Sequence, residues 1–295
     1  MQQIVSVAAI PPSYDENQAL EIRSTQEYIK YLEKGGCHSV MTTAGTSQFN
    51  LLDINEIHRL NKCIAENFNK NNILGIPPLS NMHVQSFVEH ANTYKTENSQ
   101  FMALYPDRFY NKQLIEDYAK CICDIVQQPI YFHCLKMRSG IAGDWNYDTD
   151  TVNRLFDLGL LIGIKEEIAN LSDSYNFMKG LHPDIHTIVA GGSMRRFCFL
   201  ESAGANSFLS GIGNLFPDIE NEFIDSASTK ERNDILKVEQ KFFNVFMKYG
   251  WHISLRASLK ILNLTCFHNR NPWPMPNNEI VQSITSLLEN ITNER

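Results

Sequence analysis

The sequence of 295 residues has few features of membrane or secreted proteins. No apolar run approaches the roughly 20 residues of a transmembrane helix, so no membrane span is expected. The first residues, MQQIVSVAAIPPSYDEN, lack a basic segment followed by a long apolar core, so no signal peptide is expected. The seven cysteines form an odd set without a C-x-x-C pair, which favours reduced thiols in a cytoplasmic protein.

Charge and missing motifs exclude further classes. The formal net charge of −7 argues against nucleic acid or an anionic membrane as the main partner. The nine histidines include no H-E-x-x-H motif, so we expect no metal site. No G-x-G-x-x-G motif follows the first apolar run, which argues against an open dinucleotide-binding sheet. A small molecule is therefore the expected partner.

Short apolar runs and helical patterns alternate along most of the chain, which is typical of a parallel sheet covered by helices. The apolar runs are Ile4–Ile10, Val40–Thr43, Ile73–Ile76, Phe101–Leu104, Ile130–His133, Leu160–Lys165, Thr187–Ala190 and Phe208–Ser210. The helical patterns are Asn17–Glu33, Gln113–Val126, Thr149–Leu158, Ser172–Leu181, Met194–Ala203, and stretches beginning near Asp53, Asn81 and Asp218. Repeats of this number and length predict an α/β fold, a (β/α)₈ TIM barrel. An open doubly wound sheet is the alternative.

The tail of the chain has a different pattern. From about Thr229, helical periodicity continues with no apolar strand between the helices. We therefore divide the chain into a barrel with the active site, residues 1–227, and a C-terminal helical bundle, residues 228–295. The bundle is expected to serve in packing and in contacts between subunits.

A lysine ends one of the most apolar runs, GLLIGIKEEI. In TIM barrels, residues at the carboxyl ends of strands face the active site. Burial among apolar groups disfavours the charged amine, and a neutral amine can form a Schiff base with a ketone. Lys165 is therefore a candidate nucleophile. The alternative is a lysine whose stem merely passes out of the strand end to solvent.

Several stretches together resemble one enzyme family. LLIGIKEEIANL resembles the strand with the Schiff-base lysine in the dihydrodipicolinate synthase and N-acetylneuraminate lyase family of class I aldolases. AAIPPSYDEN, AGTSQFNLLDINE, PIYFHCLKMRSG and AGANSFLSGIGNLFP are similar to its first, second, fifth and eighth strands and the turns after them. IVAGGS is similar to the seventh strand. The resemblance spans essentially the whole chain in the correct order.

The resemblance implies a fold, an activity and partners. The fold is a (β/α)₈ barrel with a helical tail, usually in a homotetramer of two tight dimers. The activity is carbon–carbon bond formation, cleavage or dehydration on a 2-oxo acid, most often pyruvate, joined to lysine as a Schiff base. The second substrate is an aldehyde or a sugar acid, and no metal or organic cofactor is used.

The resemblance also implies roles for individual residues. Lys165 forms the Schiff base, and the loop with Gly45 and Thr46 holds the substrate carboxylate through a hydroxyl and backbone amides. Three further residues line or border the substrate pocket by the same comparison: Gly191 on the seventh strand, Leu209 beside the lysine, and Arg138 at the pocket mouth. A guanidinium suits planar contact with a carboxylate.

The departures from the family pattern concern proton transfer. His133 stands where the family has a tyrosine, and Gly45 replaces that tyrosine's hydroxyl partner. Gln48 replaces a glutamate, and Pro106 stands where synthases carry a tyrosine that reaches across the dimer. A catalytic His133 would titrate between about pH 6 and 8. The alternative is a structural histidine.

Three functional hypotheses remain open. The first is a Schiff-base lyase or aldolase outside lysine biosynthesis, and the second is a true 4-hydroxy-tetrahydrodipicolinate synthase. The third is a barrel that binds a 2-oxo acid without turnover. Two loops match no substrate signature, and their aromatic residues either form a lid or pack on helices: Phe109, Tyr110, Trp145 and Tyr147.

Overall fold

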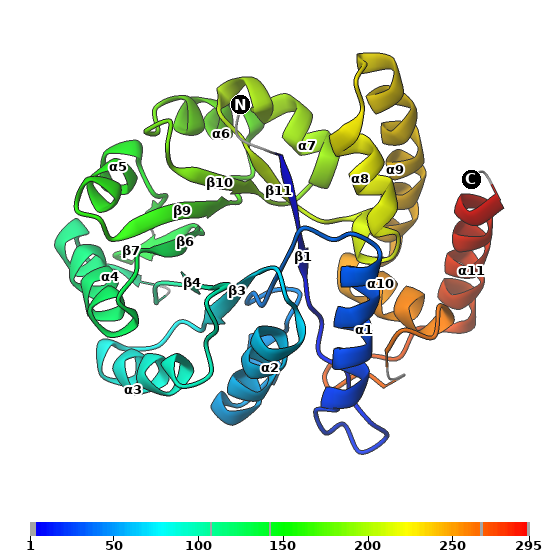
Figure 1. Cartoon of the computed structure of the whole chain (residues 1–295), viewed down its shortest axis with the longest axis horizontal. Helices are drawn as coiled ribbons and strands as arrows, with labels where there is room; N and C mark the ends of the chain where they lie inside the picture. Colours follow the sequence, from blue (N-terminus) through cyan, green and yellow to red (C-terminus); the bar gives the residue numbers. More distant parts are fainter. Residues whose placement is uncertain (1–3, 107, 142, 266–267, 294–295) are drawn as a thin grey trace.

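The computed structural model describes residues 4–106, 108–141, 143–265 and 268–293. Parallel strands close into a barrel in the order β1-β11-β10-β9-β6-β4-β3-β2 (Figure 1). The barrel strands are β1 Val5–Ala9, β2 Ser39–Met41, β3 Asn71–Ile76, β4 Ser99–Ala103, β6 Ile130–Cys134, β9 Leu161–Glu166, β10 His186–Val189 and β11 Ser207–Leu209. Each predicted apolar run overlaps one of them, so the TIM barrel prediction is confirmed.

Helices surround the barrel on its outer face (Figure 1). They are α1 Ile22–Lys34, α2 Ile54–Asn67, α3 Asn81–Asn92, α4 Lys112–Val126, α5 Thr149–Asp157, α6 Leu171–Lys179, α7 Ser193–Leu200 and α8 Pro217–Asp225. Side-chain caps fix several starts, as where Asp53 and Glu56 form a capping box at α2. The prediction of a helix from Asn17 is wrong at its start, because Glu21 caps α1 and accepts hydrogen bonds from Arg23 N and Ser24 N.

The register of β9 decides which of its side chains face the barrel interior. Ile162 packs in the inner cluster, whereas Ile164 belongs to the layer between strands and helices. A shift in the pairing of β9 with β6 falls between Leu161 and Gly163, so the simple alternation is broken there. A one-residue shift exchanges the two faces of a strand. Lys165 therefore points inward, where uninterrupted alternation from Ile162 would have pointed it outward.

A small second sheet lies beside the barrel strands and was not expected from the sequence. It contains β5 Arg108–Phe109, β7 Met137–Ser139 and β8 Gly143–Trp145 in the order β5-β7-β8. The rings of Phe109 and Trp145 stack with their centroids 4.2 Å apart. Tyr147 is buried and its ring lies 4.9 Å from that of Trp145. These aromatic residues pack on one another, and only Tyr110 among the four is largely exposed.

The tail is helical, as predicted. It contains α9 Thr229–Tyr249, α10 Trp251–Ile261 and α11 Asn278–Asn293. A capping box of Ser228 and Glu231 starts α9. The tail is also joined to the barrel, because the buried Glu239 of α9 accepts hydrogen bonds from Met194 N and Arg195 N at the start of α7. In the part of the chain that the structure describes, no helix is long and apolar enough to cross a membrane.

Candidate active site

A cavity of about 490 Å³ opens at the carboxyl ends of the barrel strands. Its walls come from the loops after β2 and β10, from β6, β9 and β11, and from α7, α9 and α10. The lining residues are Thr43, Ala44, Gly45, Thr46, His133, Leu135, Lys165, Glu167, Gly191, Gly192, Ser193, Arg195, Leu209, Ser210, Phe243, Met247, Trp251 and His252. The structure therefore brings together six of the residues singled out by sequence: Gly45, Thr46, His133, Lys165, Gly191 and Leu209.

Lys165 lies at the centre of a closed set of polar contacts. Its side chain is buried, with a residue exposure of 3%. Nζ lies 2.8 Å from His133 Nε2 and 2.9 Å from Glu167 Oε2. His133 Nε2 in turn lies 2.8 Å from the same Glu167 oxygen. The amine therefore touches a potential base on each of two sides.

These three contacts limit where the protons sit. Burial raises the pKa of Glu167, but hydrogen bonds and charge from His133 and Lys165 outweigh it and hold this pKa well below its usual range. Burial and the neighbouring Lys165 lower the pKa of His133 to about 4, so its ring is neutral at pH 7. A neutral ring that donates from Nε2 to Glu167 cannot also accept a proton there. In the tautomer with the proton on Nε2, His133 donates to Glu167, and Lys165 donates to the same carboxylate oxygen.

Burial also acts directly on the amine. It lowers the pKa of Lys165, while the charge of Glu167 opposes that shift. The pKa of His133 lies below the range of pH 6 to 8 expected from the sequence, because that expectation took no account of burial. Burial therefore shifts both side chains toward their neutral forms, relative to the same groups in water.

Two adjacent carboxylates, Glu166 at the end of β9 and Glu167 directly after it, lie in different surroundings. Glu166 is fully buried outside the barrel wall, where both its oxygens accept from Arg196 Nη2 at 2.9 and 3.0 Å. Glu167 faces the cavity instead, with 38% of its side chain exposed. Glu167 was not singled out from the sequence. The available signal was the pair of adjacent glutamates, because neighbouring strand residues point to opposite faces and only one of the two can face the cavity.

The loop after β2 is held in place from both sides. Ser47 Oγ donates to Ile10 O at 2.6 Å and accepts from Thr43 N at 3.0 Å. Thr46 Oγ1 accepts from Trp251 Nε1 at 3.3 Å, which leaves the hydroxyl proton of Thr46 for a ligand. A Cβ on Gly45 would meet nothing within 4 Å, so this position has room for a side chain.

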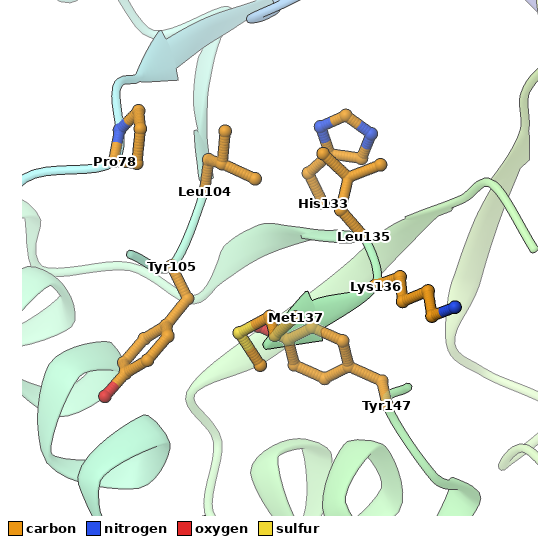
Figure 2. A pocket seen from close by; sticks show the side chains of 8 residues that line it. All are labelled: Pro78, Leu104, Tyr105, His133, Leu135, Lys136, Met137 and Tyr147. Carbon is orange, nitrogen blue, oxygen red and sulfur yellow. The ribbon is translucent and has the colours of Figure 1, made fainter. Parts of the chain in front are cut away.

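A second, smaller cavity of about 120 Å³ lies on the other side of His133. Figure 2 shows its walls, which are Pro78, Leu104, Tyr105, His133, Leu135, Lys136, Met137 and Tyr147. His133 and Leu135 line both cavities and so stand between them. Lys136 pairs with Asp144 at 2.5 Å, which leaves apolar side chains to dominate the small cavity.

Arg138 is the one residue singled out by sequence that the structure keeps apart from the others. It lies on β7 in the small sheet, is exposed, and is not among the residues that line the large cavity. Its strand pairs with β5 and β8 rather than with the barrel. A sequence match to a loop motif could not show that this short sheet forms.

The fold and the site define a class: a (β/α)₈ barrel with a buried lysine that faces a cavity at the strand ends. The chain belongs to the Dihydrodipicolinate synthetase family, whose profile matches residues 3–291. Members of this family are lyases. The family resemblance seen in the sequence is thereby confirmed.

Known proteins agree with this assignment. The chain is 24% identical over 277 residues to the 4-hydroxy-tetrahydrodipicolinate synthase of Karelsulcia muelleri (strain GWSS). The matched stretch covers 91% of this chain and 90% of that protein. The fold of this chain matches that of the N-acetylneuraminate lyase of Fusobacterium nucleatum with a TM-score of 0.85 at 14% identity, and the match covers 99% of each chain. It matches the dihydrodipicolinate synthase of Oceanobacillus iheyensis with a TM-score of 0.83 at 16% identity, covering 99% of this chain and 98% of that one.

Proposed function

We propose that this protein is a lyase that acts on a 2-oxo acid through a Schiff base with Lys165. The observation that carries the proposal is a buried lysine on β9 whose amine faces a large cavity and contacts both Glu167 and His133. Burial of an amine favours the neutral, nucleophilic form. Membership of a family of lyases supports the same reaction class.

The chemistry follows from the contacts of Lys165. The neutral amine adds to the C2 carbonyl of the 2-oxo acid, and the resulting carbinolamine loses water to give an iminium ion. Glu167 and His133 lie within 2.9 Å of Nζ, so they are positioned to move protons in these steps. Loss of a proton from C3 then gives an enamine. The enamine adds to an aldehyde, or forms in the reverse cleavage, and water releases the product.

The rest of the cavity suits the substrate carboxylate. The hydroxyl of Thr46 and the backbone of the loop after β2 supply donors near the strand ends. In this proposal the iminium ion withdraws electrons from C3, so the reaction calls for no metal or organic cofactor. A homo-oligomer, a dimer or tetramer, is part of the proposal because the family resemblance implies it, and a cytoplasmic location is part of it because of the cysteine usage.

Trapping of the iminium ion tests the proposal. We expect borohydride added with pyruvate or a related 2-oxo acid to increase the intact mass by one reduced adduct, mapped by peptide analysis to Lys165. Lys165→Ala should abolish the adduct, and Lys30→Ala, at an exposed position on α1, should keep it. An unchanged mass across a broad panel of 2-oxo acids would contradict the Schiff-base proposal and favour the binding barrel.

A second enzyme function is a true 4-hydroxy-tetrahydrodipicolinate synthase, and it is favoured by the name of the curated relative. That assignment predicts condensation of pyruvate with aspartate semialdehyde by the purified protein. The replacement of the family tyrosine by His133 and of its hydroxyl partner by Gly45 argues against it. Product formation at rates typical of biosynthetic enzymes would decide in its favour.

A further inference from the structure

The large cavity contains a charged side chain that the Schiff-base chemistry does not use. Among the described residues that line it, the lysine and arginine side chains are Lys165 and Arg195. Arg195 lies in the first turn of α7, directly after the loop that carries Gly191. Its side chain is 31% exposed. Arg195 takes no part in the contacts of Lys165 with His133 and Glu167, and it is only partly exposed to solvent. Its place in the cavity therefore requires an explanation.

Arg195 is held from one side by α9. Its guanidinium lies over the ring of Phe243 at 4.4 Å, and Nη1 donates to Gln240 Oε1 at 2.6 Å. Nε lies 3.5 Å from Glu239 Oε2, but within the described residues it makes no hydrogen bond. A guanidinium has five N–H groups, so most of its donors remain for a ligand. The position of the group is fixed while its hydrogen-bonding capacity is largely unused.

The partner carboxylate neutralises this cation only in part. Glu239 is fully buried, and its oxygens already accept the backbone N–H groups of Met194 and Arg195 at 3.1 Å. Burial, with the nearby charge of Glu220, raises the pKa of Glu239 to about 8 despite the opposing effect of Arg195. Around pH 7 the cavity therefore presents net positive charge at Arg195, and an anionic ligand group is favoured there.

The cavity is also larger than a three-carbon acid requires. Its volume of about 490 Å³ lies in the range of clefts that enclose drug-sized ligands. Pyruvate joined to Lys165 would leave much of that space empty. The remaining space is bordered by Phe243, Met247 and Trp251 as well as Arg195. A longer ligand with an apolar middle and a charged far end fits this arrangement.

We propose that Arg195 binds a second carboxylate at the far end of the substrate, so that the preferred ligands are dicarboxylic 2-oxo acids. This inference rests on the proposed function, since it takes the 2-oxo end to lie at Lys165. A guanidinium offers a planar pair of donors that matches a carboxylate. The single positive charge of Arg195 suits a singly charged carboxylate better than a doubly charged phosphate.

Matched ligand pairs test the inference without knowledge of the natural substrate. Binding is measured by calorimetry for dicarboxylic 2-oxo acids of five to seven carbons and for the amides of their far carboxylates. At the best chain length we expect the acid to bind about 10- to 100-fold more tightly than its amide, as for a hydrogen bond to a charged group. Arg195→Gln should bring that ratio close to one, and Arg195→Lys should give an intermediate value. Arg23→Gln, on the exposed face of α1, is the matched control and should keep the wild-type ratio.

The outcomes separate this inference from the proposed function. Equal binding of acid and amide by the unaltered protein at every length would overturn the inference, even if Arg195→Gln fails to fold. Loss of the preference in Arg138→Gln, and not in Arg195→Gln, would overturn it and assign the carboxylate to the small sheet. A preference that depends on Arg195, with no borohydride adduct, would support the carboxylate site and contradict the Schiff base.

Discussion

The two sides of the cavity hold their polar groups in different ways. On the strand side, Lys165, His133 and Glu167 form three mutual contacts of 2.8 to 2.9 Å, and the first two side chains are almost fully buried. On the helix side, Trp251 donates to Thr46 at 3.3 Å, Arg195 donates to Gln240 at 2.6 Å and is 31% exposed, and Met247 is 67% exposed. The strand side is largely closed, whereas the helix side is partly open to water.

This difference suggests a division of labour. Groups that move protons must hold their geometry to fractions of an ångström, and neighbouring strands of one barrel supply that rigidity. Groups that recognise the rest of the substrate can lie on helices, where side chains change without disturbing the barrel. The comparison therefore predicts large effects on reaction rate from the strand side and smaller effects on binding from the helix side.

The largest effect is expected from Glu167→Gln. We propose Glu167 as the base for the C3 proton, because its carboxylate lines the cavity 2.9 Å from Nζ. The amide keeps the shape of the side chain but cannot take that proton, so proton transfer should slow by about 10²- to 10⁴-fold. Exchange of the pyruvate methyl protons in deuterated water, followed by NMR, measures this step directly. The borohydride adduct should still form. The control variant Glu97→Gln, at an exposed site before β4, should exchange the methyl protons at the wild-type rate. A wild-type rate in Glu167→Gln itself would show that Glu167 pairs with Lys165 but does not take the proton.

The next effect concerns stability on the strand side. The pKa of His133 is about 4 in the folded protein and about 6.5 in an unfolded chain, so the unfolded state binds more protons between these values. The free energy of unfolding should therefore fall as pH drops from 6.5 toward 4, with up to about 3 kcal/mol from His133. Chemical denaturation at several pH values measures this dependence of the free energy of unfolding on pH. His58 and His186 add to the slope, because burial lowers their pKa values to about 4 as well.

His133→Asn should remove part of that slope. The exposed His83→Asn on α3 serves as the control and should leave it unchanged. If His133→Asn has the wild-type slope, folding does not lower the pKa of His133, and the assignment of a neutral ring to the folded protein is wrong.

A smaller effect is expected where the two sides meet. Thr46→Val removes a hydroxyl donor to the substrate carboxylate, which should weaken binding by about 1.5–3 kcal/mol. Calorimetry with pyruvate in the Lys165→Ala background isolates this contribution from covalent bond formation. Unchanged affinity would mean that the loop after β2 binds another part of the substrate.

The smallest effect is expected on the helix side. Trp251→Phe keeps the aromatic contacts with Phe243 and Phe246 but removes the donor that orients the Thr46 hydroxyl. Binding should weaken by about 0.5–1.5 kcal/mol, less than in Thr46→Val. The same calorimetric experiment compares the two variants. A larger loss in Trp251→Phe would show that the helix side positions the substrate as strictly as the strand side.

The sequence predicted the strand side well and the helix side poorly. Strands were visible because buried parallel strands are continuous apolar runs, and Lys165 stood out at the end of one. The inward direction of Lys165 was expected from its place at the end of a strand, but the register shift between β6 and β9 that produces it was not visible, and Glu167 was missed. The sequence also gave no sign that Arg138 would lie on a separate sheet or that Arg195 would line the cavity. Both depend on contacts between segments far apart in the chain.

The hydrogen bond between Thr46 and Trp251 joins residues that are 205 positions apart. At synthesis rates of about 5–20 residues per second, roughly 10–40 s separate the appearance of the two residues at the ribosome. The last barrel strand, β11, ends at Leu209, well before Trp251 is made. The nascent chain can therefore complete its strands before the wall formed by α9 and α10 exists. During that interval Lys165 would face an unfinished cavity, and competence to bind substrate would be acquired late in synthesis.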